Sequence, residues 1–363
     1  MITIRLETLL RETCLIPALA GFEQKMAAYM QEKFEEMGYE VTIDLFGNCI
    51  AKVEGKDPEA EPVMIFGHMD QLGFLVKYIE GNGFLRLERL GGIPEKVLPA
   101  LEVQVQNREG KMFDGLIGVR SHHSTPPEEK YVVEKYPKLF VDIGATSREQ
   151  VEELGITVGS PVVYAPKFKR LLGDVVSGTS MDNRIATSVV LELGYLFKDN
   201  PPDMPVYLVG TVQEEFNLRG AMMAARSIKP KFAIAIDVAL DGGTPGSEGT
   251  THVMLGQGPV ISHYNFHGRG TLNGTIPHPA MVRLFERTAE EKGIAFQRYA
   301  SIGMLTDMAY VQLEGTGVYG IDIGIPCRYT HTPVETCNLQ DLETTAQLVF
   351  AAVHNMKDMD LSR

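Results

Sequence analysis

An apolar segment that stops at two adjacent carboxylates limits the fold of this chain more than any other feature. Residues 205–211 read PVYLVGT, and Glu214 and Glu215 follow after two residues. A run without charged residues is typical of a strand buried on both faces, as in the sheets of α/β proteins. Adjacent residues at the end of a strand point in different directions. One carboxylate can therefore bind a metal ion while the other faces a substrate.

Further candidate ligands follow other apolar strands or lie in loops. They are His68 in GHMD, Asp182 in GTSMDNR, Asp237 in AIAIDV and His331 in RYTHTP. We expect His68 to follow a buried strand at 62–67 and Asp237 to end one at 232–237. Open α/β sheets place their sites at the carboxyl ends of strands. Histidine and carboxylate groups gathered there are what a two-metal hydrolase needs.

Each of these residues also has an ordinary structural interpretation. Asp182 opens a predicted helix at 182–197, where it could serve only as an N-cap. Asp237 could pair with an arginine instead of a metal ion. His68 and Asp70 form a His-x-Asp pair, in which the carboxylate could orient the imidazole of a metal ligand. The combination of residues is the stronger signal.

Five ligands can hold two tetrahedral ions if one carboxylate bridges them. Two divalent ions so held would acidify a water molecule and polarise a carbonyl group. The glutamate of the pair 214 and 215 that is not a ligand is then free to act as general base. The spacing of the residues leaves open which of the two glutamates that is.

Composition excludes several other classes of protein. The 363 residues carry a formal net charge of −13, which argues against binding to nucleic acid phosphates. We expect no membrane-spanning segment, because no stretch approaches the roughly 20 apolar residues that one needs. The N-terminus has no signal-peptide pattern. The cysteines are scattered, which favours reduced thiols and a cytoplasmic location.

The secondary-structure signals change between residues 73 and 165. Short strand patterns dominate this range, and turn residues separate them. The patterns are FLVKYI, FLRLERL, LEVQVQ, MFDGLIGV, LFVDIG and PVVY. Thr146 to Glu149 reads as a capping box for one short helix. We expect an α/β domain with a mixed sheet and an α/β/α architecture, formed by residues 1–72 and 166–363, with a small inserted β-barrel-like domain at 73–165.

Outside this range, helical periodicity is found at 23–37, 182–197, 221–228, 279–293 and 338–356. Two strands at 39–45 and 49–55 read as a hairpin. The remaining histidines carry weaker signals. His122 and His123 lie in a polar loop and are expected at the surface. For His263 and His267, core, loop and substrate-cleft positions all stay open. The GxSxG motif of a catalytic serine is absent from the sequence.

These residues resemble the TET-type, or tetrahedral, metallo-aminopeptidases, which include glutamyl and deblocking aminopeptidases. The matching segments run in family order over about residues 20–350. They are GHMDQLGF, SGTSMDNR, VGTVQEEFNLRGA, AIAIDV, GQGPVI, TDMAY and IPCRYTHTPVE. The resemblance implies that His68 and Asp237 hold one ion, that Glu215 and His331 hold the other, and that Asp182 bridges them. It further implies that Glu214 is the general base and that Asp70 orients His68.

The same resemblance implies that the inserted domain takes part in assembly from dimers into a hollow dodecamer. The chain departs from the family at Gln71, where glutamate is usual, and in the loop at 120–130. Some family members have been labelled endoglucanases. A glycosidase needs two carboxyl groups about 5–10 Å apart that flank the scissile bond. Glu214 and Glu215, with one of them on a metal ion, do not supply that pair.

The sequence thus predicts a metal-dependent aminopeptidase of short peptides, with two divalent ions per subunit. Zinc is the first expectation, and cobalt or manganese suit the same ligands. One alternative is a deacylase of small N-acyl compounds on the same metal scaffold. The other is a non-catalytic assembly or accessory protein.

Overall fold

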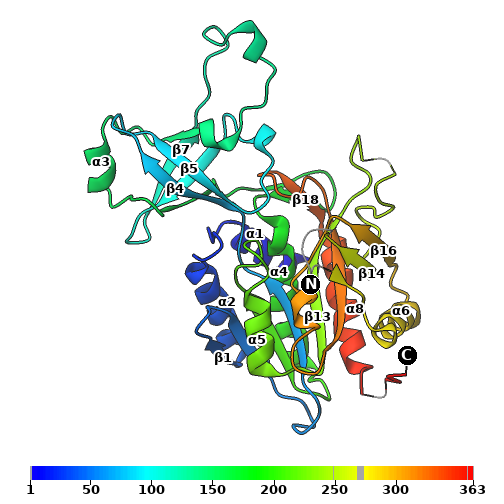
Figure 1. The fold of residues 1–363 in the computed structure, drawn as a ribbon. Coiled ribbons are helices and arrows are strands. Elements are labelled where there is room, and N and C mark those ends of the chain that lie inside the picture. Colours follow the sequence, from blue (N-terminus) through cyan, green and yellow to red (C-terminus); the bar gives the residue numbers. More distant parts are fainter. Residues whose placement is uncertain (1, 248, 268–273, 358, 363) are drawn as a thin grey trace.

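A mixed sheet forms the centre of the computed structural model, which describes residues 2–247, 249–267, 274–357 and 359–362 (Figure 1). Its strands are β1 (Glu40–Ile43), β2 (Cys49–Val53), β3 (Val63–His68), β12 (Val206–Thr211), β13 (Phe232–Leu240), β14 (Val260–Phe266), β15 (Gly274–Thr275), β16 (Gln297–Ile302) and β17 (Tyr319–Cys327). The order is β1-β2-β12-β3-β13-β17-β14-β15, with β16 paired to β14. Four neighbouring strands, β12, β3, β13 and β17, run parallel. Strands β2 and β14 flank them in the antiparallel direction.

Helices cover both faces of this sheet. They are α1 (Ile2–Cys14), α2 (Gln24–Met37), α4 (Met181–Asp199), α5 (Gly220–Ile228), α6 (Pro279–Lys292), α7 (Met308–Val311) and α8 (Leu339–His354). Ile65 and Ile234 belong to the core that the sheet forms with α1, α2, α4, α6 and α8. Their strand neighbours Met64 and Ala233 belong to a second core with α5 and α7. The alternation of apolar side chains along the central strands therefore builds three layers, as predicted.

A closed barrel is inserted between β3 and α4. Its strands are β4 (Gly73–Ile79), β5 (Leu85–Leu90), β6 (Glu102–Gln106), β7 (Met112–Ile117), β8 (Phe140–Asp142) and β9 (Pro161–Tyr164), in the order β4-β5-β8-β7-β6-β9. Each falls on a strand pattern seen in the sequence, and the barrel has a separate apolar core. Figure 1 shows the barrel beside the α/β body, with the segment between β7 and β8 projecting from it. The fold class is confirmed, whereas the division into domains at residues 72 and 165 stays a prediction.

Smaller elements complete the barrel segment and the α/β body. They are the helix α3 (Arg148–Glu153), the short turns η1 (Glu95–Val97), η2 (Pro127–Glu129) and η3 (Tyr136–Lys138), and a small sheet of β10 (Phe168–Arg170), β11 (Val175–Gly178) and β18 (Glu335–Asn338). Helix α3 begins one residue later than the predicted capping box. Its N-cap is Ser147, whose side chain accepts the backbone N–H of Gln150. No helix in the described part of the chain is long and apolar enough to cross a membrane.

Candidate active site

The parallel register of the central strands brings the predicted site residues to one edge of the sheet. Thr211, at the end of β12, pairs with His68, at the end of β3. On the other side of β3, Ala235 pairs with Phe66, and continuing that register by two residues places Asp237 level with His68. The sequence suggested that Asp237 ends its strand, and this prediction was wrong. Strand β13 continues to Leu240 because β17 pairs with it over its whole length.

Two buried carboxylates hold the loop that follows β12 and carries the paired glutamates. The backbone N–H of Gln213 donates to Glu23 at 3.1 Å, and those of Glu214 and Glu215 donate to the two oxygens of Asp70 at 3.0 Å each. The loop closes where Gly220 N–H donates to the carbonyl of Val212 at 2.9 Å. A Cβ on Gly220 would lie only 2.3 Å from that carbonyl oxygen, so this close approach requires glycine.

Asp182 lies between the two histidines. Its Oδ1 is 3.1 Å from Nε2 of His68, and its Oδ2 is 3.5 Å from Nε2 of His331. Although Asp182 falls in the first turn of α4, its backbone is non-helical (φ −79°, ψ 102°), and Ser180 occupies the N-cap position. The carboxylate of Asp182 is therefore available to both histidines.

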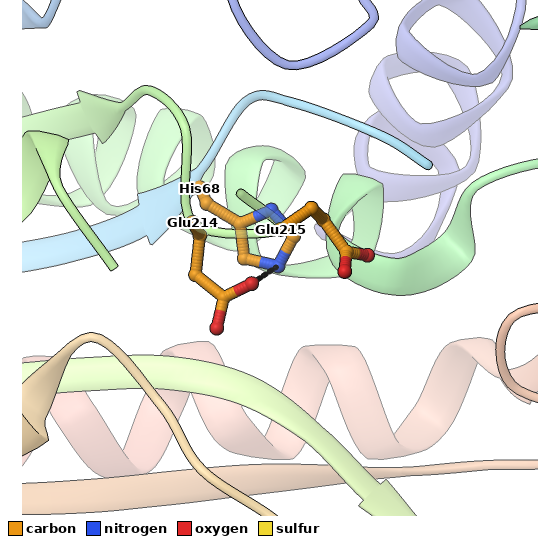
Figure 2. A group of neighbouring side chains, drawn as sticks. All are labelled: His68, Glu214 and Glu215. Carbon is orange, nitrogen blue, oxygen red and sulfur yellow. Dashed lines mark ion pairs between the residues drawn. The ribbon is translucent and has the colours of Figure 1, made fainter. Parts of the chain in front are cut away.

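The two glutamates lie near different histidines, as expected for adjacent residues at a strand end. Oε2 of Glu214 is 3.8 Å from Nε2 of His68, and Oε1 of Glu215 is 4.0 Å from Nε2 of His331. Figure 2 shows Glu214 and Glu215 on either side of the His68 ring, with their carboxylates directed apart. Both line a cleft of about 770 Å³ with His68, Asp182, Asp237 and His331.

The possible metal-binding atoms fall into three groups, and some residues belong to more than one group. Ligand atoms of His68, Asp182 and Asp237 lie within 4.8 Å of one another, and so do those of Asp182, Glu215 and His331. His68, Glu214 and Glu215 form a further group. Oε1 of Glu215 is buried and has no hydrogen-bond partner among the described residues, although a buried polar atom needs one. Imidazole and carboxylate groups at these separations could hold metal ions.

Each histidine is fixed through the nitrogen that faces away from Asp182. Nδ1 of His68 lies 3.2 Å from the carbonyl oxygen of Asp70 and 3.5 Å from its Oδ1. Nδ1 of His331 lies 2.6 Å from the carbonyl oxygen of Gly92, a residue of the inserted barrel. A proton on Nδ1 that donates to these oxygens leaves Nε2 free as the ligand atom.

Burial and mutual repulsion raise the pKa of most carboxyl groups in the cleft. Burial and the charge of Glu215 hold the pKa of Glu214 well above its usual range. Burial and the charge of Asp182 raise the pKa of Glu215 to about 7. Burial by itself would lower the pKa of His331, but the charges of Glu215 and Asp182 raise it to about 10. Cations bound among these groups would relieve the repulsion.

A buried arginine lies behind the site. Arg184 is fully buried, and burial lowers its pKa to about 10. Its guanidinium donates to the carbonyl oxygens of Met69 and Ile16 and, at 3.2 Å, to Oε1 of Gln71. The same Oε1 accepts the backbone N–H of Ala18 at 2.9 Å. Gln71 thus supplies a neutral acceptor to this cation.

Sequence reasoning missed the residues that orient the predicted ligands from elsewhere in the chain. Gly92 and Glu23 carry no motif that would reveal them, and Glu335 lies in the matching segment IPCRYTHTPVE without a role assigned to it. His122 and His123 are exposed, as expected. Core, loop and substrate-cleft positions were left open for His267, and its side chain lines the cleft.

Comparisons with known proteins relate this chain to one peptidase family. The family model for the M42 glutamyl aminopeptidases matches residues 47–348. The lysyl aminopeptidase of Pyrococcus furiosus is 30% identical over 349 residues, which cover 95% of this chain and 96% of the relative.

Solved structures extend the same likeness. The aminopeptidase APDkam598 from the archaeon Desulfurococcus kamchatkensis has a TM-score of 0.89 and 31% identity, with 99% of each chain covered. The TET1 peptidase of Pyrococcus horikoshii, described as able to assemble into a tetrahedron or a large octahedral shell, has a TM-score of 0.86 and 28% identity, with 97% of this chain and 100% of that chain covered. This chain therefore belongs to the M42 glutamyl aminopeptidase family and is a peptide hydrolase of the aminopeptidase type.

Proposed function

We propose that the chain removes N-terminal residues from short peptides with the help of two divalent metal ions. His68 and Asp237 would hold one ion, and Glu215 and His331 would hold the other. Asp182 would be shared. The observation that carries this assignment is that the two oxygens of Asp182 face two different histidines, at 3.1 Å and 3.5 Å. A carboxylate placed in this way can bind two ions at once.

The ions would supply an acidified water molecule and a polarised peptide carbonyl. Glu214 then acts as the general base: it accepts the proton of the attacking water and passes it to the leaving amine. Its carboxylate lies in the cleft beside His68. Asp70 acts through other residues, since it orients His68 and binds the backbone N–H groups of Glu214 and Glu215.

Zinc is the proposed metal because zinc accepts both imidazole and carboxylate ligands in tetrahedral sites. Cobalt and manganese suit the same donor atoms. The decisive experiment is a panel of aminoacyl chromogenic substrates, assayed with a chelator and with each added metal. We expect cleavage that is lost on chelation and restored by one of these ions. Cleavage of N-acetyl compounds in preference to free-amine substrates would instead indicate a deacylase.

We further propose that the chain assembles from dimers into a dodecamer. The support comes from the exposed apolar residues of the segment between β7 and β8: Val119 is 51% exposed, Tyr131 is 93% exposed and Val132 is 66% exposed. Exposed apolar surface of this kind marks interaction sites. One similar solved structure, PhTET1-12s, is described as a dodecamer in the asymmetric unit. Light scattering on the purified protein tests this proposal.

A further inference from the structure

A buried carboxylate outside the proposed ligand set joins two of the ligands. Glu335 is 2% exposed and begins strand β18. Its Oε1 accepts the backbone N–H of His331 at 2.5 Å, and its Oε2 accepts the backbone N–H of Asp182 at 2.9 Å. Each oxygen therefore has a donor of its own, and Glu335 spans two ligands that are far apart in the sequence.

Both of these backbone segments are irregular and need external support. His331 has a φ of 65°, which is uncommon for a residue with a side chain. It lies in a loop closed by backbone hydrogen bonds between Arg328 and Thr336. Asp182 is non-helical at the start of α4. Neither N–H group has an assigned strand or helix partner, and Glu335 accepts both.

The small sheet places Glu335 between the two segments. Strand β18 pairs antiparallel with β11, and Glu335 lies opposite Gly178, four residues before Asp182. His331 precedes Glu335 by four residues on the other side. The side chain of Glu335 thus connects the turn that opens α4 with the loop that carries His331.

We propose that Glu335 is a positioning residue for the metal centre. Glu335 holds Asp182 and His331 at the separation that one ion requires. This inference rests on the proposed two-ion function. It assigns Glu335 no contact with substrate or metal, because both of its oxygens are bound to backbone N–H groups. Groups that orient metal ligands typically change metal affinity about 10–100-fold when they are replaced.

The test is the substitution Glu335→Gln. Glutamine has nearly the same size but only one acceptor oxygen, so its amide NH₂ would face one of the two N–H donors. Metal binding is measured by competition with a chromophoric chelator, and Co²⁺ binding is also followed by visible absorption. We expect one of two ions to bind about 10–100-fold more weakly, with a changed Co²⁺ spectrum.

Asp341 offers a matched control. It is 1% exposed and also accepts two backbone N–H groups, from Gly256 at 2.7 Å and from Gly258 at 2.8 Å. It does not belong to the residues that line the cleft. Asp341→Asn therefore turns an amide NH₂ toward one of two comparable N–H donors, away from the metal centre. We expect this variant to lower the thermal unfolding midpoint while both ions bind as in the unmodified protein.

Three results would overturn the inference. Wild-type affinity for both ions in Glu335→Gln would do so, and so would an equal loss of affinity in Asp341→Asn. If Glu335→Gln does not fold, Glu335→Asp, whose carboxylate is one methylene shorter, is measured in the same way, and unchanged affinity there is the third. If the unmodified protein binds no ions, the proposed two-ion function fails. If the unmodified protein and the Glu335 variant bind two ions with equal affinity, only the positioning role of Glu335 fails.

Discussion

The carbonyl oxygen of Gly92 lies 2.6 Å from Nδ1 of His331, so a residue of the inserted barrel orients a proposed metal ligand of the α/β body. The two residues are 239 positions apart in the sequence. The barrel was expected to act in assembly, and this contact gives it a direct connection to the active site as well. Displacement of the barrel would therefore change the orientation of His331.

Gly92→Ala tests this connection. The added Cβ would lie 3.3 Å from Nδ1 and 3.4 Å from Cε1 of His331, which is tighter than an ordinary contact. We expect about a tenfold or greater loss of metal affinity, as for other groups that orient ligands. Gly81→Ala is the control, because a Cβ at Gly81 meets nothing within 4 Å. Equal metal affinity in the two variants would contradict the prediction.

Glu214→Gln should keep its metal ions and lose turnover. A general base contributes about 10²–10⁴-fold to the rate, and glutamine cannot accept the proton. Elemental analysis and kcat on a chromogenic substrate measure the two quantities. Loss of a metal ion in this variant, with both ions kept in Glu215→Gln, would show that the roles of the two glutamates are exchanged.

Asp182→Ala should empty or disorder both metal sites, because this carboxylate is the one shared between them in the proposal. His68→Ala should affect mainly one ion, since His68 is proposed to bind only one. Metal stoichiometry of the two purified variants distinguishes them. Two tightly bound ions in Asp182→Ala would refute the bridging role.

Metal binding at pH 7 should release protons. In the metal-free protein, the charges of Glu215 and Asp182 outweigh burial and raise the pKa of His331 to about 10, so this imidazole is protonated at pH 7. Burial raises the pKa of Glu215 to about 7, so about half of this group is protonated there as well. Because ligands must lose their protons to bind, metal affinity should rise as the pH rises from 7 towards 10.

Calorimetric titration in buffers of different ionisation enthalpy counts the protons released. We expect at least one proton per chain at pH 7 and a smaller number at pH 10. A binding enthalpy that is the same in every buffer would argue against these protonation states.

Activity should be limited by substrate size if the chain forms the proposed shell. Short unfolded peptides should be trimmed, whereas a folded protein with a free N-terminus should be left intact. Mass spectrometry of both substrates after incubation gives the answer, with light scattering on the same sample. Efficient trimming of the folded protein, or a monomer in solution, would exclude the shell while leaving the metal chemistry in place.

Local patterns in the sequence were sufficient for two of the central strands and for the barrel strands. Buried apolar runs located β3 and β12, and short runs between turn residues located all six barrel strands. The pattern misjudged the end of β13, because its extension to Leu240 depends on pairing with β17. Strand β17 itself was missed, since Gly320, Asp322 and Pro326 interrupt its apolar run.

The site shows the same limit more sharply. The proposed ligands could be named because each follows a strand or stands in a recognisable motif. The groups that orient them could not, because the contacts of Glu335 with Asp182 and of Gly92 with His331 join distant segments. A backbone carbonyl has no side-chain identity that a sequence could reveal. Such contacts become visible only when the fold is known.

The long pairing of β13 with β17 has a consequence for how this chain can change in length. Side chains alternate between the two faces of a strand, so removal of one residue ahead of Asp237 within β13 would turn this carboxylate to the opposite face. Ile236 and Val238 are buried and would exchange places with it. Insertions and deletions are therefore confined to the surface connections, such as the segment between β7 and β8, whereas the strand that carries Asp237 has a fixed length.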